Sequence, residues 1–533
     1  MIRPPRIPRT PEFAAYLITT LLALVPLWIA PVFPSQDGGS HLYNAHVLGS
    51  LLTGDNVPYA DIYRLNFAAL ANWSDHLVLA LLTSVVAAPT AEKLLLSAYV
   101  LLFAAAARYA AASIHPERAW LSHLALPLVF TFSVHMGFYN FILCFPLYFF
   151  LIGYYWRHRD GRHAGGLAVL LLALYVLHPL AWLFGLLSLT LLVLAGARNV
   201  HVHGHTSAAT TAARVLRVWL AGAPGAILLL VLVGHEPTEF AAWQPLPDLV
   251  RHIYFGGPLW TFSPVDTAFG GAVFALFMTI TVFAWRSAHA DSATTALAWT
   301  TAAYIALLVL LPSQWKSLGL ITERVGTFAF MTWVVALAGQ TYSPRVRRIA
   351  IVCAQVLALL LVARWTLVVR SLEPYVREYL SVAPQIAREH RVLELNFAPR
   401  GRDAEGDRLV HPVAPFAHTV GLIGASRDAV ILNDYEALTT VFPLTQRSDA
   451  AARLESTLHD PPDFRLEDLE AYERATCEPI DYIIVWQPDA GDPHTRAMLD
   501  SLREHWRLVY VSQPGGYARL WEREALTPTA DCG

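Results

Sequence analysis

The sequence predicts a polytopic α-helical membrane protein with about 11 transmembrane helices and a C-terminal soluble α/β domain. Of the 533 residues, 55% are hydrophobic and only 15% are charged. Long apolar runs fill the chain up to Arg370, and charged residues and prolines become common after it. This composition excludes a soluble globule. The formal net charge of -3 gives no basic surface, so no nucleic acid is expected as a partner.

Apolar runs of about 15 to 22 residues predict the membrane spans. The first begins at Phe13 with no small-residue cleavage site before Pro34, so we expect an uncleaved span rather than a signal peptide. The expected spans lie near residues 13–33, 93–112, 119–134, 137–156, 165–178, 180–197, 215–233, 266–286, 293–312, 325–340 and 349–369.

Arginine placement predicts the orientation of these spans. With the N-terminus in the cytoplasm of a bacterium, most loop arginines fall on the inner side of the inner membrane, as the positive-inside rule requires. This holds only if the apolar stretch from His76 to Ala88 does not cross, and about a dozen residues before Pro89 are too few to span comfortably. We therefore expect an interfacial helix there, within a large outer loop over residues 34–92.

The composition after residue 370 predicts an extracytoplasmic α/β domain over residues 371–533, separate from a membrane domain over residues 1–370. A helical linker is expected over residues 371–395, and an amphipathic helix over 493–506 begins at Asp492 or Pro493. Cys477 and Cys532 can form a disulfide if this domain faces an oxidising compartment. Strand-like segments lie at residues 392–397, 429–433, 481–486, 508–512 and 517–521.

A polar loop directly after the first span holds the first candidate catalytic residue, Asp37. Residues 35–46 read SQDGGSHLYNAH. An ionisable group at a membrane face carries a desolvation cost that is usually tolerated only for pairing or function. The alternative is an ordinary helix N-cap at Asp37. His41, one helical turn later, can orient Asp37 or bind the acceptor, while the simpler interpretation is a histidine on a helix face or at the membrane interface.

A later outer loop, over residues 311–324, holds two candidate phosphate-binding cations. Lys316 and Arg324 are expected at the outer membrane face, and the guanidinium fork of arginine suits phosphate oxygens. The alternative is interfacial snorkelling or a local ion pair with Glu323.

Other polar residues are candidates for a sugar or acceptor pocket, although helix capping and an aromatic membrane belt explain them as simply. A group of three histidines over residues 201–205 is a weak metal site on the cytoplasmic side. Walker A, GxSxG, HExxH and Rossmann motifs are absent from the sequence, which removes the usual support for a pump, a serine hydrolase or a zinc protease. The candidate pocket residues are His135, Tyr139, Asn140, His178, Glu236 and Glu239.

This layout resembles the GT-C superfamily of membrane glycosyltransferases. The resemblance rests on Asp37 at the start of the first outer loop, the H-x-Y-x-A pattern from His41 to Ala45, the interfacial helix, the many short spans and the outer C-terminal domain. It implies transfer of a sugar from a polyprenyl-phosphate carrier to a glycan, lipid or protein acceptor, with Asp37 as the catalytic base. It also implies that a late-loop cation, Arg324 or Lys316, contacts the donor phosphate.

The residues agree with that chemistry. Inverting transfer to a hydroxyl needs one carboxylate to remove a proton, and phosphate leaves without a separate general acid. Only Asp37 is acidic at the start of the loop, where many GT-C members have two acidic residues, so we expect no cofactor, or at most an optional divalent cation. Two alternatives stay open. A transporter or flippase would show paired intramembrane charges and internal symmetry, and an inactive GT-C-like scaffold would have the same sequence pattern.

Overall fold

The computed structural model describes residues 10–55, 57–67, 70–159, 164–203, 208–234, 241–286, 292–315, 318–455, 465–489 and 491–524. The chain forms two compact units. Unit 1 consists of Met1–Ile29, Leu96–Ser133 and Asn140–Leu367. Unit 2 consists of Ala30–Leu95, Val134–Tyr139 and Val368–Gly533, so the segment predicted as the first outer loop (residues 34–92) and the C-terminal part of the chain belong to the same unit.

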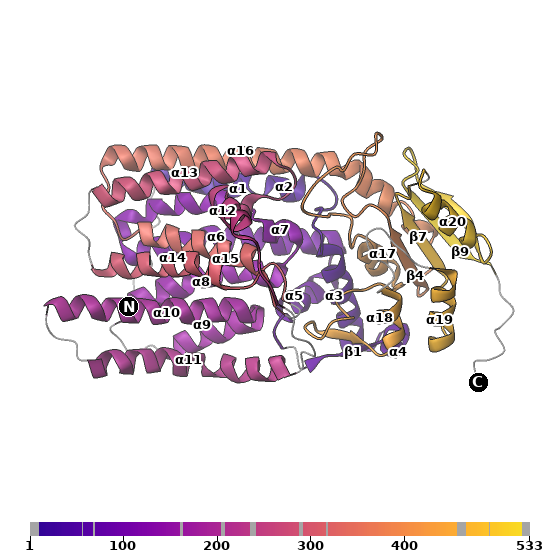
Figure 1. Ribbon diagram of the computed structural model, residues 1–533, viewed down its shortest axis with the longest axis horizontal. Coiled ribbons are helices and arrows are strands. Elements are labelled where there is room, and N and C mark those ends of the chain that lie inside the picture. Colours follow the sequence, from indigo (N-terminus) through magenta and orange to yellow (C-terminus); the bar gives the residue numbers. More distant parts are fainter. Residues whose placement is uncertain are drawn as a thin grey trace. The chain divides into compact units, whose positions relative to one another are not determined.

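Unit 1 is built from helices (Figure 1). Its helices are α1 (Pro11–Leu22), α2 (Val25–Trp28), η2 (Pro116–Leu128), α9 (Ala164–Leu177), α10 (Pro179–His203), α11 (Ala208–Gly234), α12 (Leu246–Tyr254), η3 (Gly257–Leu259), α13 (Val265–Arg286), α14 (Ser292–Leu310) and α15 (Ile321–Leu337). The short strands β2 (Ala241–Ala242) and β3 (Gln314–Trp315) pair in antiparallel fashion. Four helices have residues in both units, namely α6 (Ala88–Ile114), α7 (Phe132–Met136), α8 (Tyr139–His158) and α16 (Pro344–Leu380).

The helices confirm a polytopic membrane protein. Within the described residues, seven helices are long and apolar enough to cross a membrane: Pro11–Trp28, Ala88–Ile114, Tyr139–His158, Pro179–Gly196, Ala208–Val233, Val265–Arg286 and Pro344–Gln385. Three other expected spans correspond to the shorter helices α9, α14 and α15. The run expected over residues 119–134 is not one continuous α-helix. It forms the 3₁₀ helix η2 and then α7, because Pro127 cannot donate a backbone hydrogen bond to an α-helical ladder.

Aromatic side chains fill the core of unit 1 around Phe328. Its ring lies 4.8 Å from that of Phe184 and 4.9 Å from that of Tyr148, centroid to centroid. The hydroxyl groups of this core are hydrogen bonded to one another: Ser188 Oγ lies 2.7 Å from the Tyr148 hydroxyl and 3.0 Å from the Tyr304 hydroxyl. Pairing these hydroxyls removes the cost of burying them away from water.

Unit 2 contains the expected α/β domain. Its mixed sheet has the strand order β5-β4-β7-β9-β8, in which β4 is parallel to β5 and β7, and β9 is antiparallel to β7 and β8. All five strand-like segments of the sequence form strands of this sheet. These are β4 (Arg391–Asn396), β5 (Val430–Ile431), β7 (Tyr482–Trp486), β8 (Trp506–Val511) and β9 (Ala518–Arg523).

One helix of this domain begins where the sequence predicts it. The helix α20 (Pro493–Leu502) begins at Asp492, whose carboxylate accepts a hydrogen bond from the Thr495 amide at 2.8 Å. In place of a continuous helical linker, α16 extends to Leu380 and is followed by the short η4 (Ala383–Gln385) before β4. The remaining helices of this part are α17 (Val420–Arg427), α18 (Asp449–Glu455) and α19 (Leu466–Thr476).

The first outer loop packs against the C-terminal segments within unit 2 (Figure 1). It contains α3 (Gly38–Thr53), α4 (Val57–Ile62), β1 (Tyr63–Leu65) and α5 (Ser74–Thr83). The strand β1 pairs in antiparallel fashion with β6 (Leu444–Gln446), and α3 packs against α5 and α17. The ten residues of α5 cover about 15 Å, too short for a span, and its Leu77, Val78 and Leu81 are exposed.

The contact between α3 and α17 brings two backbones together and requires glycine on both helices. A Cβ atom built on Gly39 would lie 2.2 Å from the carbonyl oxygen of His418. A Cβ atom built on Gly421 would lie 2.2 Å from the carbonyl oxygen of Gly39. Backbone atoms cannot move aside as a flexible side chain can, so any larger residue forces the two helices apart.

We therefore expect Gly39→Ala to destabilise the protein by about 1–3 kcal/mol, the usual cost of overpacking. The measurement is thermal unfolding of the detergent-solubilised protein. Gly196→Ala in α10 is the matched control, because a Cβ atom there meets nothing within 4 Å. That change should be neutral or slightly stabilising. Equal midpoints for the Gly39 variant and the unmodified protein would contradict the close helix contact.

Candidate functional site

A cluster of buried carboxylates and histidines lies within unit 2, on three segments of the chain. The helix α3 contributes Asp37 at its start and His41 one turn later. The first turn of α5 contributes Asp75 and His76. The turn that follows β5 contributes residues 434–436, at the carboxyl end of a parallel strand, where α/β sheets commonly place their functional side chains.

Asp37 occupies the N-cap position of α3, yet its side chain makes no capping hydrogen bond. The carboxylate instead accepts hydrogen bonds from the side-chain amide of Gln36, at 3.3 Å, and from the Tyr435 hydroxyl. His418 Nε2 lies 3.7 Å from Asp37 Oδ1. The residue is 6% exposed. Helix capping, the simpler interpretation of this residue, therefore does not account for its side chain.

Burial raises the pKa of Asp37 to about 7, and the nearby negative charge of Glu436 acts in the same direction. The positive charge of His41 and the hydrogen bonds from Gln36 and Tyr435 lower the pKa in part. A carboxylate with a pKa near neutrality is matched to the task of a general base at physiological pH.

The backbone around Asp37 is fixed by the segment that precedes α8. The backbone amide of Gln36 donates a hydrogen bond to the carbonyl oxygen of His135, and that of Asp37 donates one to the carbonyl oxygen of Met136, both at 2.9 Å. Gly137 follows with a positive φ of 84°, which brings it so close to the Asp37 backbone that a Cβ atom would lie 3.0 Å from the Asp37 nitrogen. His135 is fully buried, with its ring stacked on Phe33. Its predicted part in a sugar pocket stays a prediction, while its carbonyl holds the Asp37 loop.

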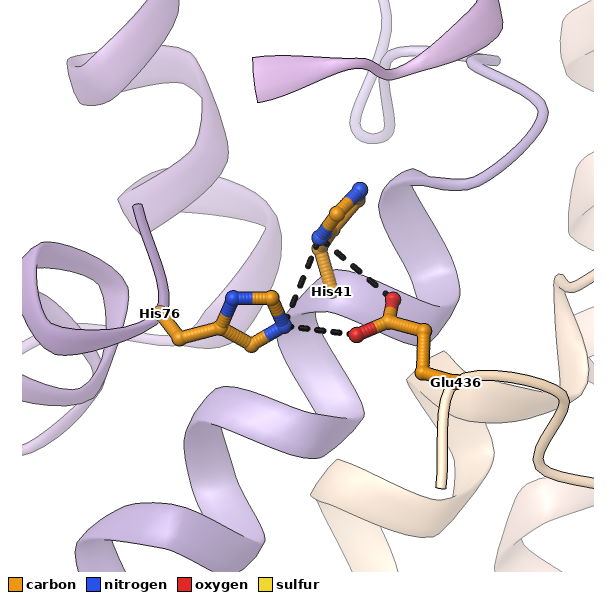
Figure 2. Close-up of side chains that lie close together, drawn as sticks. All are labelled: His41, His76 and Glu436. Atoms are coloured by element: carbon orange, nitrogen blue, oxygen red, sulfur yellow. Dashed lines mark hydrogen bonds and ion pairs between the residues drawn. The ribbon is translucent and has the colours of Figure 1, made fainter. Parts of the chain in front are cut away.

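Figure 2 shows the second part of the cluster, in which His41, His76 and Glu436 point toward one another. His41 Nδ1 lies 3.4 Å from His76 Nε2 and 3.4 Å from Glu436 Oε1. His76 Nε2 lies 2.6 Å from Glu436 Oε2. Asp75 lies beside both rings, with its Oδ2 atom 3.1 Å from His41 Nδ1. All four side chains are between 0% and 2% exposed, so His41 is not an interfacial histidine.

The charges of this group shift one another's pKa values. Burial lowers the pKa of His41 and His76, but the adjacent carboxylates of Glu436 and Asp75 outweigh it and raise both. Burial raises the pKa of Asp75, and the two histidines outweigh it and hold the value well below its usual range. The histidines lower the pKa of Glu436 against its burial in the same way. Two histidines and two carboxylates therefore form a charge-balanced group.

A further buried carboxylate, Asp434, is held by α3. Its Oδ1 atom accepts hydrogen bonds from Asn44 Nδ2 at 2.8 Å and from Ser40 Oγ at 3.3 Å. Burial raises the pKa of Asp434 to about 7, with the charge of Glu436 adding to the effect. Ser40 and Asn44 lie one turn apart on the face of α3 that meets the turn after β5, which explains why short polar residues stand there.

Tyr139, a candidate pocket residue, belongs to a different buried group. Its hydroxyl donates a hydrogen bond to Glu92 Oε1, and Ser35 Oγ lies 3.0 Å from the same oxygen. A Cβ atom on Gly38 would collide with all three of these side chains. A cavity of about 10 Å³, lined in part by Ser35, Gly39 and Glu92, lies at this point and has room for about one water.

Arg324, His178 and Asn140 belong to unit 1. Arg324 lies in the first turn of α15, is 8% exposed, and has its Nη1 atom 2.8 Å from His178 Nε2. Its guanidinium also stacks on the ring of Phe141 at 5.0 Å. The structure thus pairs two residues that the sequence placed in separate candidate groups. The side-chain oxygen of Asn140, the second residue of α8, accepts a hydrogen bond from the Phe141 backbone amide at 2.8 Å.

Several sequence-based predictions fall outside the described residues. They concern Lys316, Glu236, Glu239, Cys532 and His205. Cys477 is described and is exposed. The predicted roles of these residues stay predictions.

Sequence reasoning missed most of the cluster, although signals for it exist. The acidic residues Asp434 and Glu436 directly follow the correctly predicted strand at residues 429–433. The pair Asp75-His76 begins an otherwise apolar helix, where two ionisable side chains are unexpected. Glu92 is likewise a carboxylate near the start of an apolar span.

Comparison with known proteins identifies the fold. No protein family model and no curated protein matches this chain. Among solved structures, the cryo-EM structure of the arabinofuranosyltransferase AftD from mycobacteria is similar, with a TM-score of 0.50 and 12% sequence identity over 98% of this chain. The fold of this chain is therefore similar to that of AftD. It spans 40% of the AftD chain, and at this identity the similarity concerns the fold alone.

This similarity of fold to a membrane glycosyltransferase agrees with the resemblance that the sequence suggested. The helical membrane part and the C-terminal mixed sheet both belong to the matched region, which covers nearly the whole chain. The orientation in the membrane, the substrates and the catalytic residue stay predictions.

The Asp434 contacts generate a stability prediction. We expect Asn44→Ala to lower the free energy of unfolding by about 1–3 kcal/mol, because Asp434 loses its shorter hydrogen bond while it stays buried. Thermal unfolding in detergent is the measurement. Thr53→Ala, at the exposed end of the same helix, is the control and should change stability by less than about 0.5 kcal/mol. A loss no larger than that of the control would contradict the assigned contact.

Proposed function

We propose that this protein is a membrane glycosyltransferase that moves a sugar from a polyprenyl-phosphate donor to a hydroxyl acceptor outside the cytoplasm, with Asp37 as the catalytic base. The proposal rests mainly on one observation. Asp37 is a nearly fully buried carboxylate at the start of α3 that does not cap its helix, and burial raises its pKa to about 7. The similarity of fold to AftD supports the same reaction class.

In the proposed reaction, the acceptor hydroxyl loses its proton to a carboxylate oxygen of Asp37. The acceptor oxygen forms a bond to the anomeric carbon of the sugar while the bond from that carbon to the phosphate oxygen breaks. Polyprenyl phosphate leaves with the bonding electrons, and the sugar configuration inverts. Because phosphate is a stable leaving group, one base suffices and no separate general acid is needed.

The neighbours of Asp37 suit this role. Gln36 and Tyr435 donate hydrogen bonds that favour its anionic form, and burial favours its neutral form. The ring of Tyr435 is itself held by stacking on His418, with centroids 4.4 Å apart. The hydrogen bonds thus orient the carboxylate, and burial keeps it basic enough to take a proton at neutral pH.

Arg324 is the proposed contact for the donor phosphate. It is a buried arginine in the first turn of α15, where the helix dipole also favours an anion. His178 and Phe141 hold its guanidinium from two sides. A guanidinium held in one orientation binds phosphate oxygens at a smaller cost in side-chain entropy.

The first test replaces Asp37 with asparagine, which keeps the shape and removes the base. We expect Asp37→Asn to lower donor consumption by at least about 100-fold while donor binding persists, since a positioned general base contributes on that scale. The assay uses purified protein with a panel of polyprenyl-phosphate sugars. Polyprenyl-phosphate arabinofuranose comes first, because AftD is named as an arabinofuranosyltransferase.

Asp55→Asn is the matched control for this experiment. It makes the same chemical change at an exposed position just past the end of α3, and should leave turnover unchanged. Equal turnover by the Asp37 variant and the unmodified protein would remove Asp37 from catalysis. If the unmodified protein bound none of the donors, the result would instead favour a transporter or an inactive scaffold.

The pKa of Asp37 generates a second prediction. A base works only when it is ionised, so turnover should rise with pH to a plateau, with a midpoint near 7. One pH unit below the midpoint, turnover should fall to about a tenth of the plateau value. Tyr435→Phe removes a hydrogen bond that favours the anion and should move the midpoint to higher pH. A flat profile between pH 5.5 and pH 8.5, or a midpoint that Tyr435→Phe lowers, would contradict the assignment.

A further inference from the structure

Several donor atoms converge on a single ring nitrogen in unit 2. His41 Nδ1 has Asp75 Oδ2 at 3.1 Å, Glu436 Oε1 at 3.4 Å and His76 Nε2 at 3.4 Å. An imidazole nitrogen carries at most one hydrogen, so it can satisfy only one of these three neighbours. The two carboxylate oxygens, Asp75 Oδ2 and Glu436 Oε1, are fully buried, and within the described part of the chain neither has a hydrogen-bond partner apart from this shared nitrogen. Such convergence is typical of ligands around a cation.

The spacing of these atoms suits a tetrahedral metal ion. Ligand atoms at about 2.0–2.1 Å from a tetrahedral zinc lie about 3.3–3.4 Å from one another. His41 Nδ1 meets this spacing with both His76 Nε2 and Glu436 Oε1, at 3.4 Å each. The candidate ligand atoms of the three side chains all lie within 4.8 Å of one another. The hydrogen bond between His76 and Glu436 would be replaced by bonds from both residues to the ion.

We infer that His41, His76 and Glu436 bind a zinc ion, with Asp75 as the fourth donor. Two imidazoles with carboxylate oxygens are a ligand set that zinc prefers, whereas magnesium and calcium prefer oxygen ligands alone. Four protein donors that are 0% to 2% exposed make a closed site, which is the structural rather than the catalytic type. The site goes beyond the proposed transferase reaction and does not depend on it.

The surroundings of the cluster support zinc binding. His76 Nδ1 lies 3.2 Å from both Asp75 Oδ1 and the carbonyl oxygen of Asn72, so Nε2 is the nitrogen that faces the site. A carboxylate or a carbonyl behind a histidine ligand is the usual way in which proteins orient it. A dipositive ion with two neutral histidines also balances the two carboxylate charges.

A zinc ion at this position would join three segments. His41 lies on α3, His76 on α5, and Glu436 in the turn after β5. Because Asp37 begins α3 one turn before His41, a metal bond to His41 fixes the helix that carries the proposed base. Metal binding should therefore raise the thermal stability of the protein, since an ion that binds only the folded state stabilises it.

The test uses a reference chain in which His201, His203 and His205 are replaced by alanine, because these histidines could take up zinc on their own. The protein carries no histidine tag. It is stripped with a chelator, dialysed against zinc, magnesium or calcium chloride, and its bound metal is measured by mass spectrometry. We expect about one zinc per chain, no retained magnesium or calcium, and a higher unfolding temperature with zinc.

Two variants locate the ion. His76→Gln should weaken zinc binding by more than about tenfold. His46→Gln should leave it unchanged, because His46 lies on the same helix but pairs with Asp428 outside the cluster. If His76→Gln does not fold, zinc X-ray absorption of the reference chain decides instead. Two imidazoles with oxygen ligands support the site.

Three results would overturn the inference: no zinc retained by the reference chain, equal retention by the His76 variant, or a zinc shell without imidazole. The experiment has no activity readout. Failure of the zinc site therefore leaves the transferase proposal standing, and failure of the transferase assay leaves the zinc result standing.

Discussion

Charge balance inside unit 2 is the constraint on which the rest of the site depends. Burying an ion without a partner costs several kcal/mol or more, so Asp75 and Glu436 are compatible with folding only because His41 and His76 lie between them. These four groups come from α3, α5 and the turn after β5, so all three segments must reach their places before the charges of the whole group are balanced. The charges therefore define one arrangement of these segments rather than simply adding stability. Glycines at positions 39 and 421 then let α3 come within backbone contact of α17.

The helix α3 links this charged group to the proposed chemistry. One face of its first two turns carries His41 toward the histidine and carboxylate group, and Ser40 and Asn44 toward Asp434. Asp37 stands just before these residues, at a helix start that Gly38 and Gly39 leave free of side chains. This short polar segment is thus held by contacts on several sides, and the hydrogen bonds from Gln36 and Tyr435 orient the carboxylate of the proposed base.

Much of the fold could be predicted from the sequence, because hydrophobic runs and strand patterns are local. The five strands of the C-terminal sheet and the start of α20 at Asp492 lie where local patterns place them. The segment 119–134 differs because Pro127 interrupts an apolar run that hydropathy alone cannot distinguish from a helix. The site was only partly predictable. Asp37 and His41 stand in a recognisable loop, but Glu436 joins them across 360 positions of sequence from His76, and no local pattern encodes such a pairing.

That separation also sets when the site comes into existence. A ribosome adds about 5–20 residues per second, so roughly 20 to 70 seconds pass between the synthesis of His76 and that of Glu436. Through that interval the first outer loop has neither the partner strand for β1 nor the carboxylate for its histidines. The nascent chain therefore inserts its membrane helices with the loop still incomplete, and the last third of translation assembles the site. A truncated product would lack the site even if every membrane helix were in place.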